Sequence, residues 1–574
     1  MFLKNLYKIK LLCILIILFA GCTRYTHQLK TLLFPNNPWN YKSTQQENWT
    51  KGEGSICQDY ENIYTESNDS VIYLTKFEWE KTSIKNIHIE INIQGNFRLY
   101  INNHPISSVN LLPYTIDTTN IKTDEDVRIR ARAHIKQTLS INKSYLEPGI
   151  NELKIVITAV DKIMDFPVNV IIRAYTRRKT PWRKVFRKFP EISIDTYNSD
   201  IPDDPKINAW LSVKEGKQIT ESAVAIEIRG HSSQIYPKKS FGFETQDSLG
   251  KNNNISLLGL PAENDWVLYA PYIDKTLMRN VLAYKIFRDM GHYSVRTRFC
   301  ELYLNESYEG VYVLIEKIKR DKNRVAISKF KNDITGGYMV SNDRSTSTLF
   351  FPSTYYHDYN TPIPFYCIYP DSSDLTEDAL NYIMQQFHRF EQSVVSGDRE
   401  AFKKHMDITS FADYLLLSEL TRNNDAYRLS TFYYKNSDSV DPKIYMGPVW
   451  DYNLAFGLAD YDNAYSFEGW IFRQNKNLIP FWWDDLMSNP YFYDFVKSRW
   501  FELRNNILSE EKLNSQIDSI ASQLYFSARH NYKRWPILWQ GIWPSYYNGP
   551  TYEDNVDYLK FWLFNRLRWM DKNI

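Results

Sequence analysis

Residues 443–457 read Lys443-Ile-Tyr-Met-Gly-Pro-Val-Trp-Asp451-Tyr-Asn-Leu-Ala-Phe-Gly457 and set one acid at the end of an apolar, strand-like segment. A carboxylate just beyond a buried strand has its backbone fixed by the sheet while its side chain points out of it. That placement suits an Asp that holds Mg²⁺ against nucleotide phosphates. Asp also starts turns by bonding to nearby backbone, so a turn acid is the alternative for Asp451.

A second acid, Asp425, follows an apolar helical run between Phe411 and Leu420. Between the two acids, Thr431–Lys435 and Lys443–Val449 are rich in aromatic and β-branched residues and flank a group of turn formers. This pattern predicts a β-hairpin. A hairpin here returns Asp451 towards Asp425, so we expect the two carboxylates to lie near each other.

Further blocks lie upstream of these acids in a definite order. They are Arg229-Gly-His-Ser-Ser233 with Tyr236-Pro-Lys-Lys-Ser240, Leu258–Trp266 continuing to Asp274–Asn280, Gly310–Lys317, and Gly336-Gly-Tyr338. Together with the two acids, these blocks resemble the spore-coat CotH kinase family, an atypical branch related to protein kinases, over residues 190 to about 572. The resemblance implies an α+β protein-kinase-like domain with a helical C-terminal lobe.

The resemblance also implies roles for single residues. Asp425 takes the place of the catalytic-loop acid and Asp451 that of the metal-binding acid, while Lys238 or Lys239 and Glu316 are candidates for the ion pair on the nucleotide side. The implied cofactors are ATP and Mg²⁺, with Mn²⁺ as an alternative ion, and the implied acceptor is a Ser or Thr hydroxyl of a protein. Phosphoryl transfer agrees with such a set, because it needs positioned phosphates, neutralised charge and an oriented hydroxyl.

Arg229, Ser232 and Ser233 surround a glycine and supply a guanidinium and two hydroxyls, a composition able to wrap phosphate oxygens. A strand edge followed by a turn with solvated serines is the alternative. Lys238 and Lys239 are neighbours, and adjacent residues on a strand point to opposite faces, so at most one is expected to reach the phosphates.

Glu316 stands where an apolar run changes to the charged run Glu316–Asp321, so a surface salt bridge is the alternative to a role beside the lysine. Asn453 is a departure from the family, since many relatives carry a second acid at this position. Asn453 offers a carbonyl oxygen to a hard cation but no negative charge, so weaker Mg²⁺ binding or an altered coordination shell is expected. A catalytically inactive surface, adhesion or glycan-binding protein that keeps the scaffold is therefore the competing hypothesis.

The composition sets outer bounds on function. With 574 residues, 43% hydrophobic and 16% aromatic, the chain has material for a large core and two or three domains. A net charge of +2 gives no argument for nucleic-acid binding. The ten His form no His-Glu-x-x-His group, which disfavours a zinc hydrolase.

The first 22 residues carry an export pattern. Lys4, Lys8 and Lys10 precede the apolar run 11–20, and Leu18-Phe-Ala-Gly-Cys22 resembles a bacterial lipobox. The resemblance implies cleavage before Cys22, lipid attachment there, and a chain tethered to a membrane of the bacterial cell envelope outside the cytoplasm. An uncleaved membrane helix is the alternative, which the shortness of the apolar run disfavours.

The region before the kinase-like blocks reads as all β. Ile87, Ile89 and Ile91 alternate with polar residues, and two phrases, 99–106 and 145–153, resemble jelly-roll domains, in which sugar binding is a minority hypothesis. Three thiols, Cys57, Cys300 and Cys367, show no pairing motif, so one disulfide or buried free thiols are both open. The expected organisation is a signal peptide at 1–21, a tether at 22–49, a jelly-roll-like β-sandwich at 50–176, a basic linker at 177–189 and the kinase-like domain at 190–574.

The end of the chain is rich in aromatic residues at helical spacing. Trp482, Trp483, Trp500 and Phe501 are placed as the buried face of helices. We therefore expect them to pack the core of the helical lobe.

Overall fold

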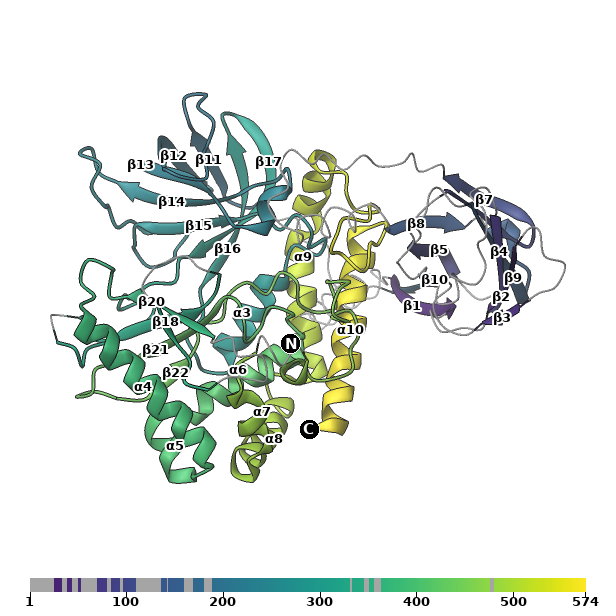
Figure 1. Cartoon of the computed structure of the whole chain (residues 1–574). Coiled ribbons are helices and arrows are strands. Elements are labelled where there is room, and N and C mark those ends of the chain that lie inside the picture. Colours follow the sequence, from purple (N-terminus) through teal and green to yellow (C-terminus); the bar gives the residue numbers. More distant parts are fainter. Residues whose placement is uncertain are drawn as a thin grey trace, which may run out of the picture. The chain divides into compact units, whose positions relative to one another are not determined.

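The computed structural model describes residues 25–33, 39–43, 50–52, 70–79, 84–92, 96–109, 136–141, 143–158, 169–179, 188–330, 333–344, 350–355, 363–474 and 479–574 (Figure 1). Within the chain, one compact unit is drawn from residues 1–184 and 537–558, and a second from residues 185–536 and 559–574. Cys22 and Cys57 lie outside the described residues. Among the helices that are described, none combines the length and the apolar character needed to cross a bilayer.

The described residues between 25 and 179 are almost entirely strands. These are β1 (Tyr25–Leu33), β2 (Trp39–Ser43), β3 (Thr50–Gly52), β4 (Ser70–Trp79), β5 (Ile84–Asn92), β6 (Asn96–Ile101), β7 (His104–Val109), β8 (Lys136–Ile141), β9 (Gly149–Thr158) and β10 (Asn169–Lys179). They form a four-stranded sheet in the order β1-β10-β5-β8 and a six-stranded sheet in the order β3-β2-β4-β9-β6-β7. Two of these strands, β1 and β2, lie in the segment predicted as a tether, and β10 includes the first residues of the predicted linker.

Alternation of apolar and polar residues explains these strands. The predicted strand around Ile87 and Ile91 is confirmed as β5, and Leu99, Leu153 and Ile155 on β6 and β9 are fully buried. A period of two places such residues on one face of a sheet. The packing of the two sheets into a sandwich stays a prediction.

A closed barrel opens the second unit. Its strands are β11 (Glu191–Asp195), β12 (Ile207–Glu215), β13 (Gln218–Arg229), β14 (Ser240–Gln246), β15 (Asp265–Tyr269), β16 (Thr297–Leu304) and β17 (Ser307–Glu316), closed in the order β11-β12-β13-β14-β15-β17-β16. All neighbours are antiparallel except the parallel pair of β11 and β16. Inward side chains such as Ile226, Phe243 and Leu314 form its core, so the outward positions are free to carry charge.

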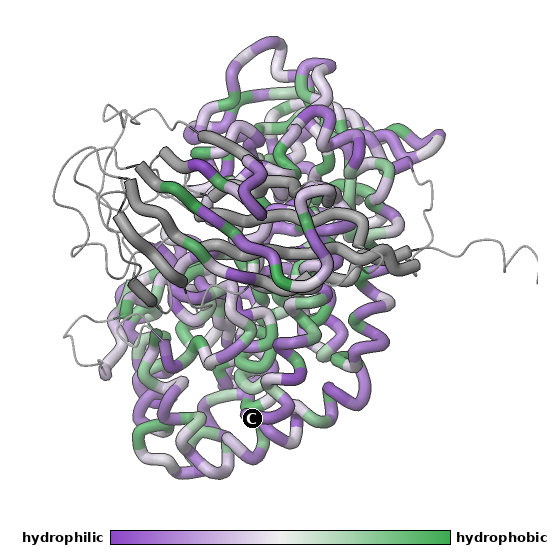
Figure 2. The backbone as a smooth tube through the Cα atoms, turned by 90° about the vertical axis from the view of Figure 1, so that its right-hand side faces the viewer, coloured by the Kyte–Doolittle hydropathy of each residue, from purple (hydrophilic) through white to green (hydrophobic). Residues whose placement is uncertain are grey.

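A second sheet and the helices follow. The strands are β18 (Tyr338–Asn342), β19 (Phe350–Pro352), β20 (Pro364–Tyr369), β21 (Thr431–Lys435) and β22 (Ile444–Met446), in the order β19-β20-β18-β21-β22. The helices are α3 (Arg279–Asp289), α4 (Glu377–Ser396), α5 (Arg399–His405), α6 (Ile408–Thr421), α7 (Trp482–Ser488), α8 (Pro490–Arg504), α9 (Glu510–Arg534) and α10 (Tyr552–Asn573). Hydrophobic and hydrophilic segments alternate along these helices in Figure 2, as expected for helices with one buried face.

The predicted hairpin between the two acids is confirmed, because β21 pairs antiparallel with β22. The predicted helix before Asp425 is α6, which begins when the Asp407 side chain accepts a hydrogen bond from Ser410 N–H and ends at Arg422 in the left-handed conformation. Every α6 residue from Ser410 to Thr421 is buried. A fully buried helix is a rigid base for the turn that follows it.

The aromatic residues of the C-terminal lobe are mostly core. Trp482, Trp483 and Trp500 are fully buried, as predicted, whereas Phe501 is 41% exposed, so its assignment to the core was wrong. Phe501 points about 100° away from Trp500 around α8 and lies outside the buried face of that helix. Cys300 and Cys367 are buried free thiols, one of the two outcomes left open by the sequence.

Candidate active site

Asp451 lies in the loop that follows β22, in a left-handed backbone conformation with φ +59°. Its backbone is held on two sides: its N–H donates to the Tyr284 hydroxyl (3.1 Å) and its carbonyl accepts from Asn423 Nδ2 (3.4 Å). A left-handed residue other than glycine is uncommon, and such conformations gather at functional sites because the surrounding structure must enforce them. The hydrogen bonds to Tyr284 and Asn423 supply that constraint.

Asp425 occupies the turn immediately after α6. Its N–H donates to Asn423 Oδ1 (3.4 Å), and its Oδ1 accepts from Arg428 Nη2 (3.1 Å). Asn423 therefore bonds to both acidic segments, which brings the turn of Asp425 against the loop of Asp451. The prediction that the hairpin returns Asp451 towards Asp425 is therefore confirmed for the two segments that carry these acids.

The two carboxylates share a desolvated, negatively charged environment. Burial, together with the negative charges of Asp425 and Asp343, raises the pKa of Asp451 to about 7, and the Arg229 guanidinium opposes this rise. Burial likewise raises the pKa of Asp425, opposed chiefly by the Arg428 guanidinium. Repulsion among like charges in a poorly hydrated site is relieved by a bound cation.

The groups around Asp451 fit a magnesium ion. The Asp451 carboxylate accepts no hydrogen bond from the described residues, and the Asn453 side-chain oxygen is buried without a hydrogen-bond partner. Mg²⁺ takes hard oxygen ligands, commonly one or two carboxylates together with substrate phosphates and waters. Within the described part of the chain, no three His, Cys, Asp or Glu side chains are grouped as metal ligands, so phosphate oxygens and water would have to complete the shell.

Arg229 ends β13 with its guanidinium in front of Trp450, 5.4 Å from the ring centre. Among the residues that the structure describes, this guanidinium has no hydrogen-bond or ion-pair partner. Burial lowers the pKa of Arg229, whereas the charges of Glu227 and Asp451 raise it. A desolvated guanidinium with unused donors beside a candidate metal-binding acid is suited to receive phosphate oxygens.

The loop after Arg229 turns at Gly230, whose φ is +106°. A Cβ added at Gly230 would lie 2.1 Å from Ser233 Oγ, so the turn requires glycine. The hydroxyls of Ser232 and Ser233 have no hydrogen-bond partner in the described structure and remain available to a ligand. Lys239 Nζ donates to the Gln234 carbonyl and so braces the same loop from inside.

Two sequence-based assignments need correction. Lys238 Nζ is buried and donates to the Val311 carbonyl (2.6 Å) and to Asn531 Oδ1 (2.9 Å), so it fastens α9 to the barrel. Glu316 is fully buried and accepts from Arg296 through both carboxylate oxygens (2.7 and 2.9 Å). The expected pair of Glu316 with a lysine is therefore not formed. The salt bridge offered as its alternative is present with Arg296, but its Glu316 end is buried rather than at the surface.

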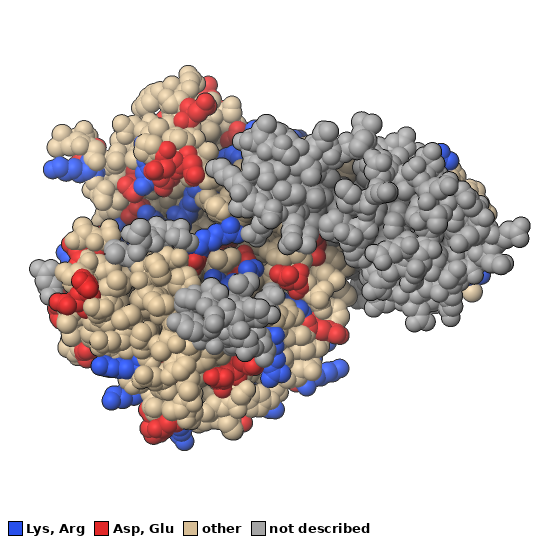
Figure 3. All heavy atoms as spheres, viewed as in Figure 1, with Lys and Arg blue, Asp and Glu red and all other residues tan. Residues whose placement is uncertain are grey.

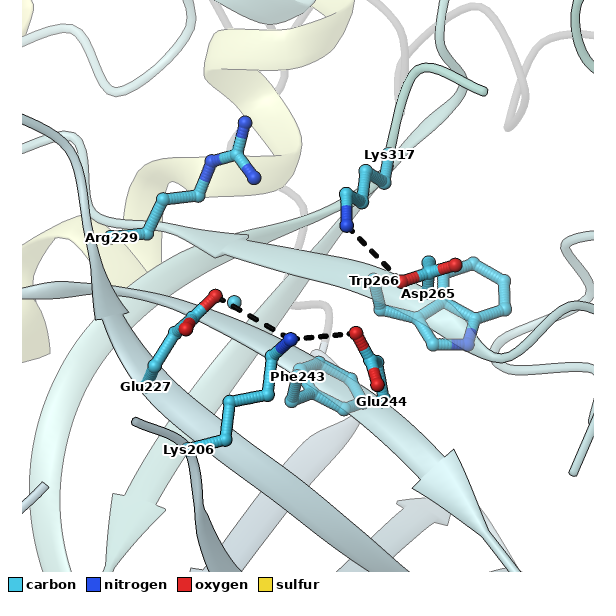
Figure 4. Close-up of a pocket in the computed structure, with 9 residues that line it drawn as sticks. Lys206, Glu227, Arg229, Phe243, Glu244, Asp265, Trp266 and Lys317 are labelled. Carbon is cyan, nitrogen blue, oxygen red and sulfur yellow. Dashed lines mark hydrogen bonds and ion pairs between the residues drawn. The ribbon is translucent and has the colours of Figure 1, made fainter. Parts of the chain in front are cut away.

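A small hollow lies on the outer face of the barrel beside Arg229 (Figure 4). It is lined by Lys206, Glu227, Arg229, Gly242, Phe243, Glu244, Asp265, Trp266 and Lys317, and its volume of about 180 Å³ includes open solvent. Ligand pockets commonly measure about 300 to 1,000 Å³, so this hollow accounts for part of a ligand at most. In Figure 4 the Arg229 side chain points away from the ion pairs of Lys206 with Glu227 and Glu244.

Several residues near the candidate site were not predicted from the sequence. Asp343 directly follows β18, and an acid directly after a strand is the same local signal that marks Asp451. Glu227 was missed although it shares a strand face with Arg229, two residues away. No local signal marks Trp450 as the partner of Arg229. Figure 3 shows blue Lys and Arg side chains gathered in a recess on the visible face of the second unit.

Comparison with solved structures gives remote matches. They include a β-D-mannosidase from Dictyoglomus thermophilum (13% identity, 39% of this chain and 35% of that chain, TM-score 0.18). They also include β-glucuronidases from an uncultured Clostridium species (12% identity, 42% of each chain, TM-score 0.19) and from Bifidobacterium dentium (9% identity, 39% of this chain and 46% of that one, TM-score 0.19). The chain spans less than half the length of these proteins, and at such TM-scores they carry no argument. No curated protein matches the chain.

A family model is more informative. The model described as CotH kinase protein matches residues 226–570, which is more than half of the chain. The match begins within β13, three residues before Arg229, and includes Asp425 and Asp451. The chain belongs to the CotH kinase family.

Proposed function

We propose that this chain is a protein kinase that transfers the γ-phosphate of ATP to Ser or Thr hydroxyls of proteins outside the cytoplasm. Membership of the CotH kinase family implies ATP use. The observation that carries the proposal is the half-buried Arg229 guanidinium, which has no partner within the described structure and faces the loop of Asp451. A cation left unpaired in a desolvated site calls for an anionic ligand.

In this proposal each acid has a separate task. Asp451, with the Asn453 side-chain oxygen, holds Mg²⁺, which when bound neutralises phosphate charge. Asp425 orients the acceptor hydroxyl and takes its proton as the hydroxyl oxygen bonds to the γ-phosphorus. The bond from the γ-phosphorus to the bridging oxygen breaks, and ADP leaves with that oxygen. The pKa of Asp425, raised by burial, suits a group that must accept a proton near neutral pH.

Phosphate oxygens are proposed to bind Arg229 and the hydroxyls of Ser232 and Ser233. Arg229 offers two parallel donors to one phosphate, and the Gly230 turn lets the backbone approach closely. Lys239 supports this loop through its hydrogen bond to the Gln234 carbonyl. Lys238 and Glu316 have structural roles in this scheme, because both are occupied elsewhere.

The location is proposed on the N-terminal sequence alone. Lipidation at Cys22 would anchor the mature chain to a membrane of the cell envelope, with the acceptor protein on the same side. Mass spectrometry of the mature N-terminus, beside Cys22→Ala, tests it: a diacylglyceryl mass on Cys22 supports the anchor, and an unmodified N-terminus opposes it.

A second candidate is a non-catalytic surface protein that keeps the scaffold. It is favoured by Asn453 in place of an acid and by the lack of a three-ligand metal group in the described residues. Sugar binding by the N-terminal strands would belong to this candidate, and a glycan array tests it.

The deciding experiment is transfer of label from γ-³²P-ATP by residues 23–574, with Mg²⁺ or Mn²⁺, to the chain itself and to casein. Labelling that Asp425→Ala and Asp451→Ala both abolish supports the kinase. Absence of labelling together with absence of a nucleotide-dependent thermal shift supports the scaffold. A bound nucleotide at a hundredfold excess over its Kd should add about 2.7 kcal/mol of stability.

A further inference from the structure

Residues 559–573 of α10 contact both segments that carry the two acids. Arg566 reaches the end of α6, which leads into the turn of Asp425, and Trp562 reaches the loop that follows Asp451. Trp562 and Arg566 are four residues apart on α10 and so share one face of the helix. A single rigid element therefore touches both halves of the site.

Arg566 is fully buried, and its guanidinium donates four hydrogen bonds to backbone and carboxylate acceptors. Its Nε donates to the Glu419 carbonyl (2.8 Å), its Nη1 to the carbonyls of Phe467 (3.0 Å) and Gly469 (2.7 Å), and its Nη2 to Glu419 Oε2 (3.2 Å). The Glu419 carbonyl also accepts from the N–H of Arg422 at the end of α6 (3.2 Å), so Arg566 adds a second donor at this helix end.

Glu419 links Arg566 to the turn of Asp425. Its Oε1 accepts from the Tyr427 hydroxyl (2.9 Å), and its carboxylate also accepts from the N–H groups of Ile471 (2.9 Å) and Phe472 (3.0 Å). Tyr427 is buried, has a left-handed backbone with φ +73°, and lies two residues after Asp425. Its unusual conformation is held by the bond to Glu419 and by its N–H, which donates to the Tyr414 hydroxyl (3.3 Å).

Trp562 supports the other segment. Its indole N–H donates to the Tyr465 carbonyl (2.8 Å), and its ring packs edge-on to Phe456 with centroids 6.4 Å apart. A Cβ added at Gly457, where φ is +69°, would lie 2.2 Å from the Trp562 ring. The loop after Asp451 therefore packs directly against α10, with no room for a side chain at Gly457.

We propose that Arg566 and Trp562 are positioning residues, through which α10 sets the placement of Asp425 and Asp451 relative to each other. The catalytic role of this positioning rests on the proposed kinase function. Arg566 acts on Asp425 through Glu419 and Tyr427, and Trp562 acts on Asp451 through Gly457. Neither residue touches substrate.

The test separates positioning from mere stability by removing both charges of the buried pair. Glu419→Gln/Arg566→Met keeps the side-chain lengths similar and, unlike either single variant, leaves no buried charge without its partner. Arg568→Met is the matched control, because Arg568 lies on the same helix but pairs with Glu510 at the surface with 59% of its side chain exposed.

Positioning predicts that the double variant loses kcat by about tenfold or more while its KM for nucleotide stays within about twofold of wild type. Arg568→Met should keep both values. A double variant with wild-type kcat would overturn the proposal, as would an equal loss in Arg568→Met.

Hydrogen exchange of the unliganded protein gives a readout that does not depend on catalysis. The double variant should exchange faster at residues 423–430, and Trp562→Phe, which loses the indole donor, faster at 452–457. Arg568→Met should change neither segment. If wild type proves unable to transfer phosphate, the kinase proposal fails while these exchange patterns still decide the positioning role; unchanged exchange in both variants would refute it.

Discussion

The Arg229 guanidinium lies 5.4 Å from the ring centre of Trp450, so the last residue of barrel strand β13 stands over the residue that precedes Asp451. The contact joins the barrel to the acidic loop without an ion pair. A salt bridge to Asp451 would occupy both groups, whereas this arrangement leaves the guanidinium and the carboxylate open to a ligand that bears phosphate and metal together.

Arg229→Met should weaken nucleotide binding. Hydrogen bonds to charged groups contribute about 1.5 to 3 kcal/mol each, so a loss of at least about tenfold in affinity is expected. Because Arg229 makes no hydrogen bond in the described structure, the melting temperature of the unliganded protein should not fall. Titration with a fluorescent ATP analogue measures the first effect and thermal denaturation the second. Lys317→Met, which removes a pocket lysine already paired with Asp265, is the control.

Asp425→Asn and Asp451→Asn should separate catalysis from metal binding. Without Asp425 the acceptor hydroxyl loses its proton acceptor, which costs about 10²- to 10⁴-fold in rate, while Mg²⁺-dependent nucleotide binding persists. Without Asp451 the metal dependence of nucleotide binding should disappear. Isothermal titration with ADP, with and without Mn²⁺, distinguishes the two. Retained metal dependence in Asp451→Asn would contradict the assignment of Asp451 as a ligand.

Metal affinity should depend on pH through Asp451. Its pKa is raised from 3.8 to about 7, so the unliganded carboxyl holds a proton over most of the acidic range. A metal must displace that proton, so affinity should rise about tenfold per pH unit up to about 7 and then level off.

The same shift affects stability without metal. A raised folded-state pKa favours folding at low pH, so the contribution of Asp451 is fully present below about 4 and is lost as pH rises to about 7. Manganese titrations and melting curves between pH 5 and about 8 test both effects, and Asp451→Asn should abolish both. Equal affinity throughout that range would argue against the raised pKa.

Lys238→Met should alter stability rather than nucleotide binding. Burial lowers the pKa of Lys238 from 10.5 to about 7. A depressed folded-state pKa gives a contribution that is present above about 10.5 and is lost as pH falls to about 7, so wild type should become more stable as pH rises between these values. The variant should lack this slope and lose about 1 to 3 kcal/mol through the Val311 and Asn531 contacts. A large loss of nucleotide affinity would instead restore the role predicted from sequence.

Gly230→Ala should disturb the loop that follows Arg229 and carries Ser232 and Ser233. A Cβ there would collide with Ser233 Oγ at 2.1 Å, and φ +106° disfavours any L side chain. Reduced nucleotide affinity is expected together with lower stability. Gly216→Ala is the matched control, because Gly216 also has positive φ (+61°) but open space around it, so only a cost of about 1 kcal/mol is expected. Equal nucleotide affinity in both variants would show that the loop does not bind phosphate.

Much of the site was readable in the sequence because its signals are local. An apolar run that ends in an acid predicted the β22 loop and Asp451, and alternating aromatic residues predicted the hairpin that returns it towards Asp425. Motif order alone indicated the family, now supported by the match over residues 226–570. These features depend on residues near one another in the chain.

The partners of the charged residues depended on contacts between distant segments. Lys238 lies in a motif that suggests phosphate binding, yet Asn531 on α9, almost 300 residues later, supplies its acceptor (sequence separation 293). Glu316 faces Arg296 because β16 and β17 are neighbours in a closed barrel, which no local pattern shows.

By itself the sequence predicted the hairpin between the two acids, the helix before Asp425, the helical C-terminal lobe and the family, because hydrophobic periodicity and motif spacing are properties of the chain. Only the tertiary structure decided which cation remains unpaired and which are used for packing. A fully buried charge must find a partner, and Lys238 finds one across the fold, whereas the half-buried Arg229 faces the loop of Asp451 without a partner in the described residues. Which acceptor lies near each cation depends on contacts between segments that are far apart in the sequence. The local spacing of residues does not reveal those contacts.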